Sequence, residues 1–170
     1  MKNFKSLFLS ICFISLFNEC FSQDLPKTKN AFYFELFGNG GLYSLNYERN
    51  IHRNIYGRIG FGTWQMVDFL SSDPENSGRI TTVPVMVSYL SGSKTHHFEI
   101  GGGLLFGNEK DQMESSPIFN LIGYIGYRAQ SFISRGFLFR IGLSPMVSLN
   151  QTNYPDRFSI SPGISFGYHF

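Results

Sequence analysis

Six charged side chains in this sequence fall on the small, polar faces of alternating segments, and they are the first candidates for chemistry. They are three carboxylates and three arginines: Glu35, Glu48, Arg58, Glu99, Arg128 and Arg140. A charge that leaves water needs a partner of opposite sign and hydrogen bonds, and an equal number of each sign supplies both. We interpret the six as a structural ion-pair network. A gated polar path for small ions is the alternative.

The four histidines are the other candidates, namely His52, His96, His97 and His169. General-base work or metal binding needs a histidine within hydrogen-bond reach of a carboxylate or serine. His97 and Glu99 are the best such pair, since they share a face. We interpret all four histidines as lying at segment ends, in contact with water or lipid headgroups. Gly101-Gly102-Gly103 is not a phosphate loop, because no helix follows it. No catalytic residue, cofactor site or metal site is predicted.

These residues are positioned by segments in which large apolar and small polar side chains alternate, as they do across a β-strand. The alternation is clearest in Arg157–Phe170, where Phe158, Ile160, Pro162, Ile164, Phe166, Tyr168 and Phe170 share one face. Eight such segments are expected, of the length that crosses a bilayer as tilted strands. They are Ala31–Phe37, Leu42–Arg49, Ile55–Met66, Ile80–Leu90, His96–Gly107, Ile118–Gln130, Gly136–Leu149 and Arg157–Phe170.

The connections alternate between tight turns and longer polar loops, as in outer-membrane barrels. Gly38-Asn39-Gly40-Gly41 is the exception, since a short type I′ hairpin turn is predicted where a long loop is expected. The polar faces are mostly glycine and serine, which suits the narrow lumen of eight strands. The sequence therefore predicts an all-β, eight-stranded, antiparallel, up-and-down transmembrane β-barrel with its apolar face outward.

The predicted strand directions place the charges inside this barrel. Glu35 falls near the middle and the other five fall toward the end with tight turns, so one network is expected to block that half. The other half is expected to be lined by glycine, serine, asparagine and Tyr124. Three prolines conflict with the prediction, because a closed barrel has no free edge to receive Pro84, Pro145 and Pro162.

The N-terminus has the pattern of a secretory signal peptide, with Lys2 and Lys5 ahead of a short apolar run. Small side chains at Cys20 and Ser22 predict cleavage before Gln23, which gives a signal peptide over 1–22 and a barrel domain over 23–170. Both cysteines would then be removed. A composition with 17% aromatic and 15% charged residues excludes disorder, and a net charge of +2 with dispersed cations gives no reason to expect nucleic acid as a partner.

The signal peptide, the GNGGLYSLNYER hairpin, the eight alternating segments and the terminal GYHF together resemble the small outer-membrane β-barrel families of Gram-negative bacteria. That resemblance implies a place in the outer membrane, among lipid and lipopolysaccharide. It also implies that Phe166, Tyr168 and Phe170 form a C-terminal signal for the outer-membrane assembly machinery. Such families include structural proteins, adhesins and a few lipid-modifying enzymes.

Function is expected to follow from the loops and the lumen. Acidic residues gather in the longer loops (Asp68, Asp73, Glu75, Glu109, Asp111 and Glu114), where they could bind lipopolysaccharide phosphates through divalent cations, meet an extracellular ligand, or only be solvated. The leading hypothesis is a structural or surface-interaction barrel whose lumen is filled by side chains. The alternatives are a lipid-modifying enzyme and a narrow ion channel.

Overall fold

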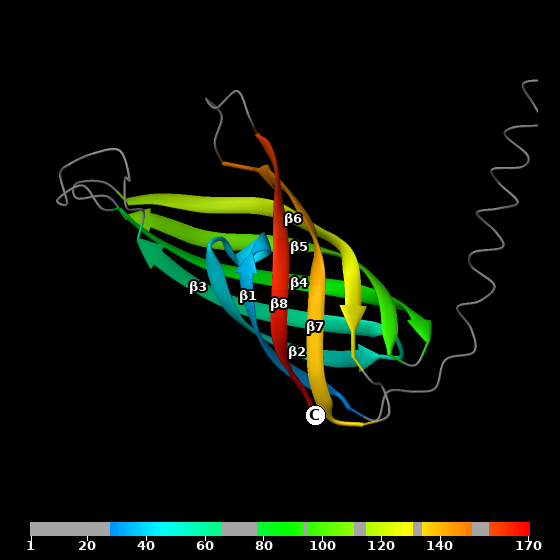
Figure 1. Cartoon of the computed structure of the whole chain (residues 1–170). Helices are drawn as coiled ribbons and strands as arrows, with labels where there is room; N and C mark the ends of the chain where they lie inside the picture. The colour runs from blue at the N-terminus through cyan, green and yellow to red at the C-terminus, as the bar shows by residue number, and fades with distance from the viewer. Residues whose placement is uncertain (1–27, 66–77, 94, 111–114, 131–133, 151–156) are drawn as a thin grey trace, which may run out of the picture.

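The computed structural model describes residues 28–65, 78–93, 95–110, 115–130, 134–150 and 157–170. The chain forms one closed barrel in which each strand pairs antiparallel with the next and β8 pairs with β1 (Figure 1). The elements are β1 (Asn30–Phe37), the 3-10 turn η2 (Gly38–Gly40), β2 (Tyr43–His52), β3 (Ile55–Gln65), β4 (Arg79–Ser93), β5 (His96–Lys110), β6 (Ser115–Ala129), β7 (Gly136–Ser148) and β8 (Phe158–His169). The predicted fold class is confirmed.

Two predictions lie outside the described residues. They are the signal peptide over 1–22 and the chemistry of the loop acids at positions 68, 73, 75, 111 and 114. None of the residues that the structure describes belongs to a helix long and apolar enough to cross a membrane.

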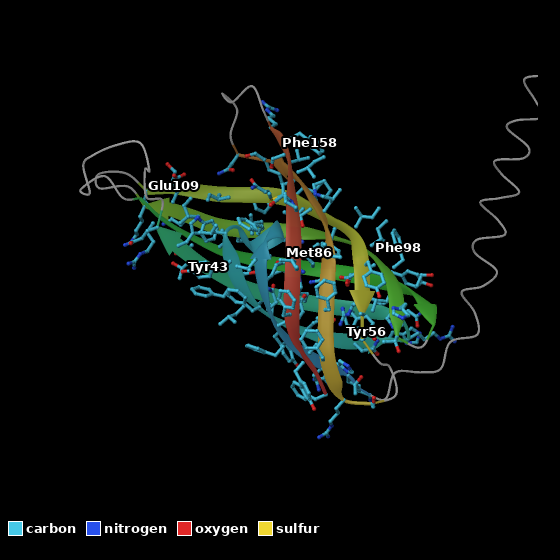
Figure 2. The ribbon with its side chains drawn as sticks, viewed as in Figure 1. Tyr43, Tyr56, Met86, Phe98, Glu109 and Phe158 are labelled. Atoms are coloured by element: carbon cyan, nitrogen blue, oxygen red, sulfur yellow. The ribbon has the colours of Figure 1, made fainter. Side chains whose placement is uncertain are left out.

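The two faces of the sheet differ as the alternation predicts. Large apolar side chains cover the outside, where Phe98 is 50% exposed and Phe137 is 64% exposed. Figure 2 shows Phe98 projecting from the barrel wall and Met86 within the barrel. The buried residues of the inner face are a mixture of charged, polar and apolar side chains. The prediction that the apolar face points outward is confirmed.

Several strands are longer than predicted at the loop end of the barrel. The β4–β5 ladder runs without interruption from Ser93↔His96 to Arg79↔Lys110, and the β5–β6 ladder continues to Lys110↔Ser115. The residues of these last rungs lie beyond the large apolar residues, so apolar and polar side chains do not alternate there. Backbone hydrogen bonds hold them in register, and such bonds leave no signal in the sequence.

The register explains how a closed barrel accommodates the three prolines. Pro84 pairs with Leu105 on β5, and the described β3–β4 ladder skips the rung at its other side. Pro145 likewise pairs on β8 and faces a skipped rung on β6, while Pro162 lies just beyond the last β1–β8 rung. Because proline has no N–H to donate, each ring lies where the ladder is interrupted or has ended.

The predicted type I′ turn at Gly38-Asn39-Gly40-Gly41 is wrong. Phe37 adopts φ 55°, which turns the chain into the barrel, and Gly38–Gly40 forms a buried 3-10 turn. The Gly38 N–H donates to the Ser161 hydroxyl at 3.1 Å, and the Thr82 hydroxyl donates to the Gly40 carbonyl at 2.6 Å. Contacts with β4 and β8 therefore override the local preference of Asn-Gly for a hairpin turn.

The lining expected for the loop half of the lumen is also incomplete. Tyr124 is there, but it belongs to a buried apolar cluster with Met86, Leu105 and Ile122. Leu105 lies six residues nearer the loop end of β5 than Glu99, and Ile122 lies six residues nearer the loop end of β6 than Arg128. We call the half of the lumen that holds the six charges the charged half, and the half that holds this cluster the apolar half.

Candidate functional site in the barrel lumen

Glu99 on β5 lies at the centre of the charges in the lumen. Its carboxylate accepts hydrogen bonds from Nε of Arg140 at 2.9 Å and from Nη2 at 2.6 Å, a fork that suits the planar guanidinium. Nη1 of Arg128 lies 3.6 Å from the same carboxylate. Arg128 and Arg140 are directly opposite each other in the β6–β7 ladder, where like charges repel. Glu99 therefore neutralises two arginines that the strand register forces together.

The other three charges extend this cluster in both directions. Nη2 of Arg128 lies 2.6 Å from Oε1 of Glu48. On the other side, Oε1 of Glu35 lies 3.9 Å from Nη1 of Arg140 and 3.6 Å from Nη1 of Arg58. The structure thus brings all six charges together in alternating order: Glu48, Arg128, Glu99, Arg140, Glu35 and Arg58. None of the six is more than 4% exposed, so water does not replace these partners.

Three buried tyrosines pack their rings beside the arginines. Cζ of Arg140 lies 4.4 Å from the ring centroid of Tyr124 and 4.9 Å from that of Tyr33. Cζ of Arg128 lies 5.2 Å from the ring centroid of Tyr56. A guanidinium over an aromatic face is attracted by the negative face of the ring. The rings therefore stabilise the cations and occupy lumen space that water would otherwise fill.

The inward turn η2 meets the charges from the apolar half. Asn39 is fully buried, and its amide satisfies its neighbours when the nitrogen faces the wall of β6 and β7. In that orientation the amide oxygen accepts from Nη2 of Arg58 at 2.7 Å, and the nitrogen donates to the Gly123 carbonyl at 3.0 Å and to the Ser144 hydroxyl at 3.3 Å. One side chain therefore links the charged network to the opposite wall.

The tight-turn end of the lumen is closed by polar contacts and two leucines. Arg128 donates from Nε and Nη2 to Oε1 of Gln130 at 2.8 and 2.5 Å. A ring nitrogen of His97 lies 3.1 Å from the Gln130 carbonyl. Leu90, which pairs with Glu99 in the β4–β5 ladder, and Leu138, which pairs with Gly167 in the β7–β8 ladder, are fully buried. The tight-turn end of the lumen is therefore filled by the barrel's own side chains.

The prediction for the histidines is only half right. His52 and His96 are exposed, and the His96 ring lies 2.5 Å from the Tyr127 hydroxyl. His97 and His169 are buried, and a ring nitrogen of His169 lies 3.2 Å from the Thr28 hydroxyl. They point inward because they lie in phase with the lumen face of β5 and β8. Among the described residues, no group of three or more His, Cys, Asp or Glu side chains could hold a metal ion.

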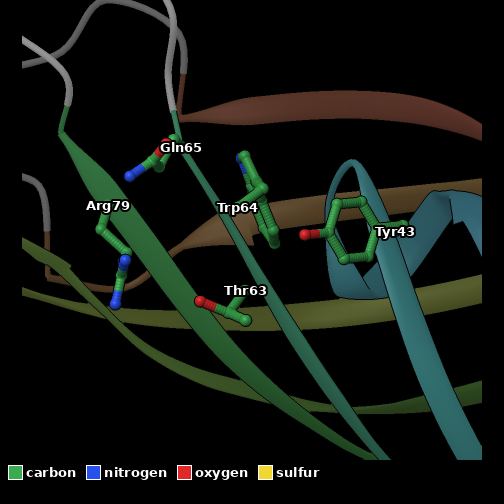
Figure 3. Close-up of a pocket in the computed structure, with 5 residues that line it drawn as sticks. All are labelled: Tyr43, Thr63, Trp64, Gln65 and Arg79. Carbon is green, nitrogen blue, oxygen red and sulfur yellow. The ribbon is translucent and has the colours of Figure 1, made fainter.

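A separate hollow of about 360 Å³ lies at the loop end of β2, β3 and β4 (Figure 3). It is lined by Tyr43, Thr63, Trp64, Gln65 and Arg79, with Trp64 lying between Tyr43 and Gln65 in this view. The hollow is open and shallow, and its single charge comes from an exposed arginine. The residues around it do not form a catalytic arrangement.

Sequence reasoning found the charges but missed the neutral groups that join them. Gln130 directly follows β6 and is in phase with Arg128, so its inward direction could have been noticed. The sequence gives only a weak indication of the role of Asn39, namely that three glycines (Gly38, Gly40 and Gly41) surround it. A Cβ on Gly41 would lie 1.8 Å from the Trp64 ring, and one on Gly40 would lie 2.4 Å from Ser44. Those glycines are needed for close packing, which a hairpin turn does not demand.

The C-terminal aromatic residues lie on the outer wall where the barrel closes. Phe166, Tyr168 and Phe170 are between 42% and 52% exposed. The Phe170 N–H donates to the Asn30 carbonyl at 2.8 Å, and the Asn30 N–H donates to the Phe170 carbonyl at 2.9 Å. The last residue of the chain therefore completes the seam between β8 and β1.

Comparison with known proteins shows likeness in structure. The barrel domain at the N-terminus of Pseudomonas aeruginosa OprF superposes with a TM-score of 0.55 at 15% identity, over 85% of this chain and 100% of that one. Ail, the attachment invasion locus protein of Yersinia pestis, superposes with a TM-score of 0.53 at 9% identity, over 86% and 98%. No family model matches the sequence, and no curated protein matches it.

The fold and the two faces of the wall define the class of this protein. A closed barrel satisfies its backbone hydrogen bonds internally, and a continuous apolar outer wall is stable in lipid rather than in water. The chain has the fold of the small eight-stranded outer-membrane barrels, the fold that it shares with the two structures above. A wall of this kind suits a lipid bilayer.

Proposed function

We propose that this protein is a structural and surface-interaction barrel of the outer membrane whose lumen is closed by its own side chains. One observation carries the proposal: six alternating charges, each no more than 4% exposed, join in a single chain of ion pairs across the lumen. A conducting pore needs water beside its charges, whereas these charges face each other and three tyrosine rings. Eight strands leave little free cross-section beyond such a network.

The same residues argue against the two alternative functions. The arginines and carboxylates that would line an ion path are each engaged by a partner of opposite sign. For a lipid hydrolase of the Ser–His type, a histidine must meet a serine, yet His169 is buried against Thr28 and His96 lies against Tyr127 on the outer wall. We therefore rank both the channel and the lipid-modifying enzyme below a non-catalytic barrel.

The interaction part of the proposal concerns the loop end. Strands β4, β5 and β6 continue beyond the apolar wall to Arg79, Lys110 and Ser115, so the barrel extends past its apolar band at the loop end. One of the two similar structures is an attachment and invasion protein by name. We propose that the loops contact lipopolysaccharide or an extracellular ligand, and that the barrel is the rigid base that presents them.

A strain that lacks the gene, scored for adhesion, envelope integrity and lipid A composition, tests the proposal. Loss of adhesion or envelope integrity with unchanged lipid A is the expected result, and it should be restored by the intact gene. A change in lipid A acylation or headgroups in the deletion strain, reversed by the intact gene, would contradict the proposal and support the enzyme.

We also propose that the ends of the chain direct its export and assembly. Residues 1–22 are cleaved as a signal peptide, and Phe166, Tyr168 and Phe170 are read by the outer-membrane assembly machinery. Mass spectrometry of the protein from envelopes should find Gln23 at the N-terminus. Deletion of Phe170 should lower the outer-membrane yield of heat-modifiable protein, while Phe158→Leu, at the other end of β8, should leave it unchanged. Equal yields for both variants would contradict the role of the terminal aromatic residues.

A further inference from the structure

The barrel wall has an interruption between β6 and β7. The described ladder runs from Asn120↔Ser148 to Ile122↔Met146 and resumes at Ile125↔Leu143, with no change in register. The skipped rungs are those of Gly123 with Pro145 and of Tyr124 with Ser144. Proline cannot donate to its neighbour, and its ring crowds the facing residue: a Cβ on Gly123 would lie 2.9 Å from Cγ of Pro145. Glycine is therefore required opposite the ring.

The interruption coincides with a groove on the outer wall. The groove has a volume of about 300 Å³, and Gly102, Gly123 and Pro145 lie along it while Leu121 and Val147 flank it. Gly102 and Gly123 are direct partners in the β5–β6 ladder, and the β6–β7 register places Pro145 opposite Gly123. The three residues therefore form one row across three adjacent strands. Elsewhere on this face the neighbours are large, as at Ile100 on β5.

Gly102 and Gly123 leave the groove open for different reasons. Gly123 has no room for a side chain, but a Cβ on Gly102 would meet only the Ile122 carbonyl, at 3.7 Å. The backbone at Gly102 has no positive φ that would require glycine. A larger residue at Gly102 would therefore fit the fold and fill the groove. The sequence keeps the space open where neither the backbone nor the packing demands it.

The inner side of the same interruption is closed. The Asn39 amide donates to the carbonyl of Gly123 and to the hydroxyl of Ser144, the residues whose rungs are skipped. An unpaired carbonyl at membrane depth costs several kcal/mol, and this contact from the lumen satisfies it. The groove is therefore a lined depression with a sealed floor.

The surroundings of the groove determine what can occupy it. It opens on the outward apolar wall, between Leu121, which is 50% exposed, and Val147. In the proposed function that wall meets the bilayer, so the groove is continuous with the surface that contacts lipid chains. Its lining is aliphatic and glycine backbone, which favours a flexible saturated chain through close van der Waals packing.

We propose that the groove between β5, β6 and β7 is a binding site for one hydrocarbon chain of a membrane lipid. The chain lies across Gly102 and Gly123 against the Pro145 ring, with Leu121 and Val147 on its sides. The site holds that chain longer than the rest of the wall holds its lipid neighbours, because the chain contacts the protein on three sides there and on one side elsewhere.

Photolabelling in proteoliposomes tests this site. The full mature protein is reconstituted in phosphatidylethanolamine and phosphatidylglycerol with a trace of phosphatidylethanolamine that carries a diazirine in its acyl chain, and adducts are mapped by mass spectrometry. Leu121 should be labelled about threefold more than Leu45 and Ile59, which are equally exposed on the opposite wall, as expected for tighter van der Waals contact.

Two variants fill the groove and one serves as a control. Gly102→Leu should reduce the labelling of Leu121 to that of Leu45, and Val147→Phe should do the same if Gly102→Leu fails to assemble. Gly57→Leu places the same new side chain on the outer wall of β3, where only the end of the Ile51 side chain must move. It should leave the excess at Leu121 unchanged.

Equal labelling of Leu121, Leu45 and Ile59 in the unmodified protein would overturn the proposal. An excess at Leu121 that survives in both groove-filling variants would overturn it as well. Adducts that join two copies of the protein through Leu121, in place of lipid adducts, would assign the groove to a protein contact and overturn it too.

Discussion

The charged half and the apolar half of the lumen are filled in different ways. In the charged half, Glu99 binds Arg128 and Arg140, and each partner has a fixed sign and a directional contact. In the apolar half, Leu105 and Ile122 pack without direction, Met86 contacts Arg58 at the boundary between the halves, and the inward turn η2 supplies polar contacts. A narrow lumen can thus be closed by paired charges or by packed aliphatic side chains.

The difference teaches which changes each half should tolerate. Removal of one partner in the charged half leaves a buried charge alone, and the cost is set by electrostatics in a site without water. Removal of a side chain in the apolar half leaves a cavity, whose cost depends on how far the neighbours relax. The methionine in the cluster is flexible, so the apolar half should adapt more readily.

The largest effect is expected for Glu99→Gln. This change leaves Arg128 and Arg140 opposite each other without their shared carboxylate, and should destabilise the barrel by about 3–5 kcal/mol. Urea unfolding in lipid vesicles measures the change. Glu109→Gln on the same strand, near the loop end and outside the network, is the control and should shift stability by no more than about 0.5 kcal/mol. Equal losses of stability for the two variants would show that the ion-pair network does not stabilise the barrel more than an ordinary charged residue does.

A smaller effect is expected for Ile122→Ala in the apolar half. The cavity should cost about 2–4 kcal/mol, since Ile122 is only 2% exposed and packs inside the lumen. The matched control is Ile125→Ala on the same strand, which is 44% exposed on the lipid side, where lipid chains can fill the space. The same unfolding assay should show the larger loss at Ile122, and the reverse order would contradict the assignment of the two faces.

The smallest effect is expected for Asn39→Ala, which tests the connection between the halves. It removes the amide from Arg58 and from the Gly123 carbonyl, and should cost about 1–3 kcal/mol. Leu42→Ala, at an exposed position of the same hairpin, should cost less than about 0.5 kcal/mol. Unchanged stability for both would mean that the inward turn only occupies space.

The sequence predicts the strands and their faces well, because lipid outside and a narrow lumen inside impose alternation on every strand. It does not predict the partners within the lumen. Glu48 and Arg58 are directly opposite in the β2–β3 ladder, yet Glu48 pairs with Arg128 and Arg58 with Glu35, across the barrel. Such contacts depend on the register of all eight strands at once, and no local pattern encodes that register.

The errors at the inward turn and at the two buried histidines have different physical origins. The inward path of Gly38–Gly40 depends on hydrogen bonds to Thr82 and Ser161, far away in the sequence. His97 and His169 are buried because they lie in phase with the lumen face of β5 and β8, where Gln130 and Thr28 contact them. The turn could not be predicted because its partners are distant in the sequence, whereas the inward direction of the histidines was present in the alternation of their strands.

Conductance in planar lipid bilayers tests most directly the central claim that the lumen is closed by its own side chains. The unmodified protein and Arg140→Met should both give no stepwise single-channel current, because the remaining charged and aromatic side chains still fill the narrow bore. A larger refolded pore inserted in the same bilayer is the positive control. Stepwise currents from the unmodified protein would contradict the claim and establish the channel in its place.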